Sequence, residues 1–127
     1  MEDVMANALT WFEIPTLDLD RAVRFYETVL GIQLKRELFG GIPHAIFPAG
    51  PSDASGALVQ DARLKPSKDG TLVYLDVTGK LEACVERVRS TGGAVLMPKT
   101  DIGEPGFIAV FRDTEGNAVG LHSARNT

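Results

Sequence analysis

Among the side chains that can move a proton, three are candidates for a functional site in this sequence: Glu13, Asp76 and His122. Trp11 lies two residues before the first carboxylate, and Tyr74 lies two residues before the second. Carboxylates that a fold holds near each other or near apolar rings are suited to proton transfer near neutral pH, and histidine changes its charge in the same range. The sequence therefore predicts a candidate site, provided that the fold brings these residues to one cavity.

Each of these residues also has an ordinary structural interpretation. Glu13 fits a carboxylate at a sheet edge or in a dimer contact, and His122 fits a solvent-facing edge position. Asp76 lies close to a strand end, where aspartate often accepts hydrogen bonds from nearby backbone amides. The aromatic rings of Trp11 and Tyr74 fit plain packing. His44 directly follows a proline at a strand start, and we expect it to be structural or exposed.

An internal repeat indicates how the chain positions these residues. Residues 9–31 return in altered form as residues 72–93, and each copy ends at a glycine, Gly31 or Gly93. In the alignment Leu9, Trp11, Glu13 and Ile14 match Leu72, Tyr74, Asp76 and Val77. A spacing of about 60 residues is too long for a solenoid unit and fits the duplication of half a domain. We therefore expect two similar halves in one domain.

The first half begins with a strand at residues 9–15, where apolar and polar side chains alternate. Asp18 is expected to cap a helix that ends at Gly31, the left-handed position after the last turn. The apolar side of this helix is Leu19, Ala22, Val23, Tyr26 and Leu30. Strands are expected at residues 32–38, 43–48 and 56–60.

The second half follows a polar linker at residues 61–70. It is expected to hold a strand at 71–77, a helix at about 80–91 and strands at 94–97, 107–112 and 117–123. Residues 98–106 read as a loop and residues 113–117 as a tight hairpin turn. The sequence thus predicts one α+β domain over residues 1–127, with βαβββ modules at about 9–60 and 71–123 that form a curved eight-stranded cup with two helices outside.

Two helices cannot cover both faces of eight strands, so one face must look elsewhere. The more uniformly apolar residues are placed under the helices: Phe12, Ile14, Leu75, Val77, Val119 and Leu121. The opposite face then carries Trp11, Glu13, Tyr74, Asp76, Gly120 and His122. Aromatic rings beside a few polar groups on a concave surface are the usual lining of a small-molecule site, and Phe107 is a third candidate ring.

Composition excludes several classes of function. The chain has 13 Lys and Arg against 17 Asp and Glu, a formal charge of −4, and no basic stripe, which disfavours binding to nucleic acid. Residues 1–9 do not resemble a signal peptide and no apolar run reaches the length of a membrane span, so we expect a cytoplasmic protein without membrane contact. The single cysteine, Cys84, cannot form an internal disulfide and fits core packing.

Several motifs together resemble the vicinal oxygen chelate superfamily, the glyoxalase, bleomycin-resistance and extradiol-dioxygenase group. They are WFEIP at 11–15, DLDRA at 18–22, FY at 25–26, Gly31, FRDTEGN at 111–117 and GLHS at 120–123. The closest likeness is to the small, single-domain branch related to lactoylglutathione lyase, and it covers about residues 9–123. This resemblance implies paired βαβββ modules that wrap a cup, usually assembled as a homodimer.

The metal ligands of that superfamily are missing from the matching positions. The resemblance implies a His or Gln early in the first strand of a module and a Glu in its last strand, but here Trp11 and the stretch 72–74 occupy the first positions and Gly120 the last. Residues 56–59 offer no carboxylate either. We therefore expect no metal cofactor, while a divalent metal at non-standard ligands (Glu13, Asp76 and His122) stays an open alternative. Gly120 is expected to open space beside His122.

Three functions remain open at this stage, because the superfamily hosts many chemistries on one fold. The first is a metal-independent lyase or isomerase, with Glu13 as general base and His122 as the acid or the group that polarises a carbonyl. The second is a non-catalytic protein of the bleomycin-resistance type, which holds a planar compound between Trp11, Tyr74 and Phe107. The third is a metal-dependent lyase or dioxygenase with non-standard ligands. Unused sheet edges also favour a homodimer.

Overall fold

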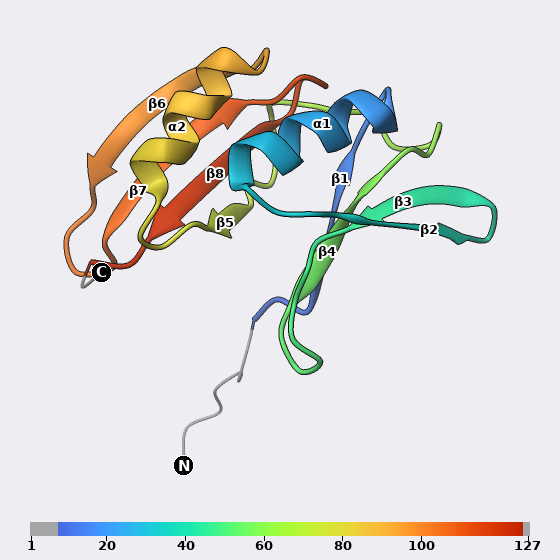
Figure 1. Cartoon of the computed structure of the whole chain (residues 1–127), viewed down its shortest axis with the longest axis horizontal. Helices are drawn as coiled ribbons and strands as arrows, with labels where there is room; N and C mark the ends of the chain where they lie inside the picture. Colours follow the sequence, from blue (N-terminus) through green and yellow to red (C-terminus); the bar gives the residue numbers. More distant parts are fainter. Residues whose placement is uncertain (1–7, 126–127) are drawn as a thin grey trace.

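The structure is a computed structural model that describes residues 8–125, and these form two four-stranded sheets and two helices (Figure 1). The first sheet has the order β1-β4-β3-β2 and the second the order β5-β8-β7-β6. In both sheets the first strand pairs in parallel with the fourth, and the other pairs are antiparallel. The elements are β1 (Trp11–Pro15), α1 (Leu19–Leu30), β2 (Lys35–Phe39), β3 (Ile42–Ile46), β4 (Ser55–Val59), β5 (Tyr74–Asp76), α2 (Leu81–Ser90), β6 (Ala94–Asp101), β7 (Phe107–Arg112) and β8 (Ala118–Ser123). The predicted pair of βαβββ modules is confirmed.

Helix α1 has the end signals that the sequence predicts. The Asp18 side chain accepts a hydrogen bond from the Arg21 amide at 3.1 Å, and Gly31 has a φ of 67°. The predicted apolar side of the helix is buried, but Phe25 and Val29 are buried too. The buried side is wider than predicted because Phe25 packs against Phe111 of the second module, at 5.6 Å between ring centroids, while Tyr26 meets Phe47 of the first module at 6.0 Å. Helix α1 thus packs against both modules.

One hydrophobic core joins both modules on the helix side of the sheets. Ile14, Leu75, Val77, Val119 and Leu121 are buried in it, as the alternation along the strands predicts. The core also contains Cys84, which is fully buried, and burial raises the pKa of its thiol. The side chain therefore fits packing and is inaccessible to reagents.

The two sheets are joined without strand pairing between them. Their link includes the turn at residues 113–117, which we call the inter-module turn. Asn117 Nδ2 donates to the Pro15 carbonyl at 2.8 Å, and Glu115 Oε1 accepts from the amides of Leu17 and Asp18, also at 2.8 Å. The sequence predicted a hairpin turn here, but its role in holding the modules together appears only in the structure.

Several strand boundaries differ from the sequence-based expectation, and the differences are largest in β6 and β5. Strand β6 continues to Asp101 through residues that the sequence assigned to a loop, because Thr100 and Asp101 pair with Ile108 and Phe107 across two register shifts. Strand β5 keeps only three residues of the predicted seven. Local sequence preference cannot find these ends because they depend on the partner strand.

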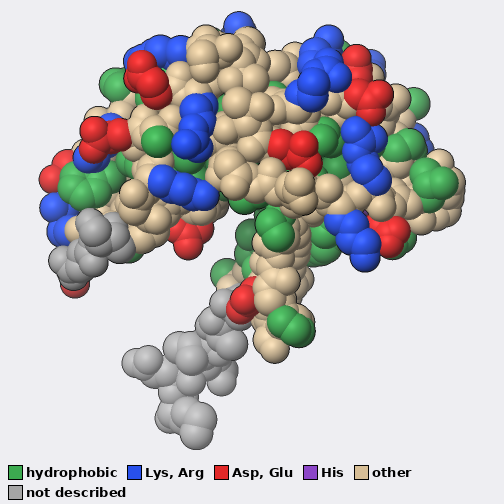
Figure 2. Space-filling view, viewed as in Figure 1, with side chains coloured by type: hydrophobic (Ala, Val, Ile, Leu, Met, Phe, Trp, Pro, Cys, Tyr) green, Lys and Arg blue, Asp and Glu red, His purple; other side chains and the backbone are tan. Residues whose placement is uncertain are grey.

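The helices lie on one side of the sheets, and the other side is open (Figure 1). In the space-filling view the molecule is arched (Figure 2). A hollow lies on the side away from the helices, next to the part of the first sheet, with β1 and β4, that extends downward in this view (Figures 1 and 2). Within residues 8–125, neither helix is long and apolar enough to cross a membrane.

Candidate functional site

Strand pairing decides which candidate residues share the open face of each sheet. In the second sheet, Tyr74 lies opposite Gly120 and Asp76 lies opposite His122, so these four residues point to the same side, away from the helices. In the first sheet, Trp11 and Glu13 are on the open side because Ile14, between Glu13 and Pro15, is buried under α1. The Trp11 and Tyr74 rings remain 41% and 43% exposed, too open for core residues.

Glu13 has two side-chain neighbours on the open face. Trp11 Nε1 donates a hydrogen bond to Glu13 Oε2 at 3.2 Å, and His44 Nε2 lies 3.6 Å from the same oxygen. The His44 side chain is only 8% exposed, and the edge of its ring meets Phe39 at 4.7 Å between centroids. The carboxylate is thus held between an indole N–H and an imidazole while its side chain keeps 40% of its surface exposed.

His44 is a candidate that the sequence analysis placed among structural or exposed residues. The residue is buried, which agrees with the structural alternative, and its Nδ1 lies 2.8 Å from the Ile42 carbonyl, so Nδ1–H donates to that oxygen and Nε2 faces Glu13. The strand register explains why His44 lies next to Glu13. Val59 of β4 pairs with His44 of β3 on one side and with Pro15 of β1, two residues after Glu13, on the other. Only this register, which local patterns do not encode, could have identified the contact.

His122 and Asp76 are each occupied by nearby backbone. His122 Nε2 lies 2.7 Å from the Pro105 carbonyl, so its N–H donates to the loop that precedes β7. Asp76 Oδ1 accepts from the Thr78 amide at 3.0 Å. Hydrogen bonding from the Thr78 side chain, and next from this amide, lowers the pKa of the Asp76 carboxyl. Local backbone bonding, the structural alternative for Asp76, is therefore what the structure shows.

Gly120 does not open space beside His122, in contrast to the sequence-based expectation. A Cβ at Gly120 would lie 2.3 Å from Tyr74 Cδ1 and 2.8 Å from Tyr74 Cγ. The aromatic ring therefore covers the glycine, and no room is left there for a larger side chain while the ring keeps its position. This glycine allows Tyr74 to lie flat against β8.

The residues present do not fit the divalent metal that the superfamily implies. The positions of the family ligands hold an indole, a phenol, a glycine and aliphatic side chains, none of which is a good donor to such a divalent metal. Among residues 8–125, no group of three His, Cys, Asp or Glu side chains is arranged to hold an ion. No step of a reaction is therefore derived through a metal.

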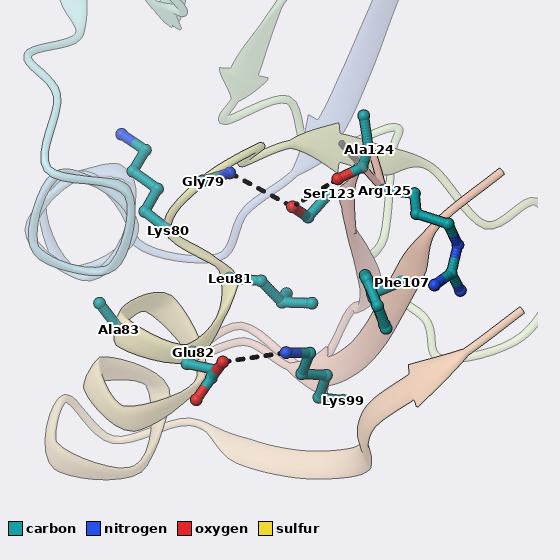
Figure 3. A pocket seen from close by; sticks show the side chains of 10 residues that line it. All are labelled: Gly79, Lys80, Leu81, Glu82, Ala83, Lys99, Phe107, Ser123, Ala124 and Arg125. Atoms are coloured by element: carbon teal, nitrogen blue, oxygen red, sulfur yellow. Dashed lines mark hydrogen bonds and ion pairs between the residues drawn. The ribbon is translucent and has the colours of Figure 1, made fainter. Parts of the chain in front are cut away.

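Phe107 lies apart from the other candidates, on the helix side of the second sheet. It packs against the hydrophobic core, and its ring is flanked by Lys99 Nζ at 4.7 Å and Arg125 Cζ at 4.5 Å from the centroid (Figure 3). These residues line a cavity of about 270 Å³ at the start of α2. Phe107 therefore does not face the open side on which Trp11 and Tyr74 lie.

The fold and the open face define a class: paired βαβββ modules with a concave surface on the side away from two helices. Residues 8–121 match the family model of the Glyoxalase/Bleomycin resistance protein/Dioxygenase superfamily. The chain belongs to this superfamily, as the resemblance in sequence predicted.

Similar proteins agree with this assignment. A "Glyoxylase-like domain-containing protein" of Didymella fabae is 32% identical over 121 residues, which cover 90% of this chain and 91% of that protein. A "Putative glyoxylase CFP32" of Mycobacterium tuberculosis is 28% identical over 127 residues, and the matched part is only 44% of its length. A crystal structure of a glyoxalase/bleomycin resistance protein from Albidiferax ferrireducens T118 has a TM-score of 0.69 and 16% identity, covers 92% of this chain and 99% of its own, and supports the fold.

Proposed function

We propose that this member of the superfamily binds a planar small molecule on its open face without help from a metal. The observation that carries the proposal is the pair of half-exposed rings, Trp11 and Tyr74, at equivalent positions of the two modules. Exposed aromatic faces beside a few fixed polar groups are the usual lining of a ligand site. Glu13 supplies such a polar group next to Trp11.

Tryptophan fluorescence tests this proposal directly because Trp11 is the only tryptophan in the chain. We expect planar aromatic compounds from a screening panel to quench or shift its emission with saturation. The Tyr74→Ala variant should weaken the best compound by about tenfold, the loss typical of one stacked aromatic pair of about 1.4 kcal/mol.

Leu17→Ala is the matched control, because Leu17 is 65% exposed and lies in the connection between β1 and α1. It should bind as the unaltered chain does. Equal affinity for the Tyr74→Ala variant, or no saturable change with any planar compound, would contradict the proposed site.

A proton-transfer enzyme is the second candidate, and the contact between Glu13 and His44 favours it. The imidazole is oriented by the Ile42 carbonyl and faces a carboxylate that still reaches the open face, as a general base requires. Glu13→Gln should then abolish turnover of a ligand found in the screen while its binding persists. The pair of Glu13 and His122 stays a prediction.

We also propose a homodimer in which the open faces of two copies meet. Support comes from the exposed apolar side chains of Leu9, Trp11, Leu72 and Tyr74, and from the edge strands β1 and β5 that lack an outer partner among residues 8–125. Sedimentation at micromolar concentration should give twice the chain mass, and a monomer would overturn the proposal.

A further inference from the structure

We propose a second ligand site, a small apolar pocket on the helix side where the two modules meet. Its cavity of about 220 Å³ is lined by Phe12, Ile32 and Phe47 from the first module and by Leu75 and Val77 from the second. We call it the seam pocket. It is distinct from the open face, because Leu75 and Val77 belong to the core on the helix side. The proposal does not depend on the function proposed above.

One wall of the seam pocket depends on a glycine. The ring of Phe12 lies across Gly56, where a Cβ would be only 2.4 Å from Phe12 Cδ2. The same ring meets Phe47 at 5.3 Å between centroids, with 46° between the ring planes. Gly56 therefore lets the Phe12 ring lie flat against the sheet, which keeps the space above it open.

The mouth of the seam pocket carries one cation. Lys80 Nζ donates to the Leu30 carbonyl at 2.8 Å, which fixes the ammonium at the C-terminal end of α1 and leaves two of its three protons for another acceptor. Asp76 also belongs to the lining, but its side chain points to the open face, because Leu75 and Val77 on either side of it are buried under the helices. Lys80 is therefore the one charged side chain that this lining presents on the helix side.

Size and charge together define the class of ligand. An apolar cavity of about 150 Å³ can hold a benzene molecule, so about 220 Å³ leaves room for a ring and one short substituent. An oxygen acceptor, as in a hydroxyl, carbonyl or carboxylate group, suits the mouth because Lys80 can donate to it. An ammonium group would face Lys80 and be repelled. The geometry thus favours a compact aromatic molecule with one oxygen acceptor.

Three probes of the same size test this assignment: benzyl alcohol, benzoate and benzylammonium, each titrated into the full chain and followed by amide NMR spectra. Benzyl alcohol should saturate and shift the amide signals of Ile32, Leu75 and Val77, and it should leave the Trp11 indole signal unchanged. Benzylammonium should bind at least about fivefold more weakly than the two probes that carry an oxygen acceptor.

A pair of Ala→Phe variants, one inside the seam pocket and one outside it, provides the matched comparison. Ala54 is exposed and lines the pocket, whereas Ala62 is exposed in the linker and outside it. Ala54→Phe should weaken benzyl alcohol by about tenfold or more, and Ala62→Phe should not change it. If Ala54→Phe loses its dispersed spectrum, Ile32→Phe fills the cavity from the opposite wall. Unchanged binding in a folded filled variant, shifts confined to Trp11 and Gly120, or equal binding of benzylammonium would overturn the proposal.

Discussion

At the scale of single residues, the open face is shaped by the glycine at position 120. The glycine there lets Tyr74 lie on β8, and the exposed ring then forms part of the surface that a ligand can meet. Trp11, the equivalent residue of the first module, holds Glu13 through its indole N–H. At the positions where the superfamily resemblance implies metal ligands, the open face of this chain therefore carries the aromatic rings of Trp11 and Tyr74.

The close approach of Tyr74 to Gly120 gives a prediction for a pair of variants. Gly120→Ala should cost about 1 to 2 kcal/mol of unfolding free energy, because the new methyl group would overlap the ring and force it to move. In a Tyr74→Ala background the same substitution should cost close to nothing. Urea denaturation of the four chains measures this coupling, and equal costs in both backgrounds would show that the ring does not lie there.

At the scale of elements, α1 and α2 begin differently. Asp18 caps α1 with its side chain, whereas Lys80 precedes α2 and makes no side-chain cap. Helix α1 is also the one that packs against both modules through Phe25 and Tyr26. The start of α1 is therefore tied to its own cap and, through Asp18 N–H, to the inter-module turn.

Removal of the cap should be measurable against a neighbouring acid. Asp18→Ala should lower the unfolding free energy by about 1 kcal/mol, the usual value of a lost N-cap. Asp20→Ala, which removes an exposed ion pair with Arg36, should cost less than about 0.5 kcal/mol. Thermal unfolding of both variants tests the difference, and similar losses would mean that the cap of α1 contributes little.

At the scale of the whole molecule, the inter-module turn connects halves that share no strand pairing. Burial alone would raise the pKa of the Glu115 carboxyl, but hydrogen bonds from Arg21 and from the amides of Asp18 and Leu17 lower it to about 2. Nearby, the buried Tyr26 hydroxyl donates to Asp113 Oδ2 at 2.7 Å, and burial raises the pKa of this tyrosine. The turn is thus a buried, fully bonded polar link.

This link should make stability depend on acid pH. The folded pKa of Glu115 lies below its ordinary value of 4.5, so its contribution is complete above about pH 4.5 and is lost as the pH falls toward 2. The full difference corresponds to about 3 kcal/mol, and because Arg21 is 42% exposed we expect about 1 to 2 kcal/mol.

Urea denaturation at pH 6 and pH 3 should therefore show a smaller loss of stability for Glu115→Gln than for the unaltered chain. Asp61→Asn is the control, since the pKa of this carboxyl is also lowered to about 2, by Arg63, within the linker. It should leave most of the dependence intact. An equal pH dependence in Glu115→Gln and in the unaltered chain would remove this role from Glu115.

The sequence by itself determined the modules, both helices with their buried sides, and the face on which Trp11, Glu13, Tyr74 and His122 lie. Periodicity and caps act over a few residues, and the internal repeat is visible when two stretches of sequence are compared, so these features can be found without the tertiary structure. Tertiary structure alone decided that His44 meets Glu13, that Tyr74 fills the space at Gly120, and that Phe107 faces the helices. Such contacts depend on strand register and on packing between distant segments, and no local pattern encodes either.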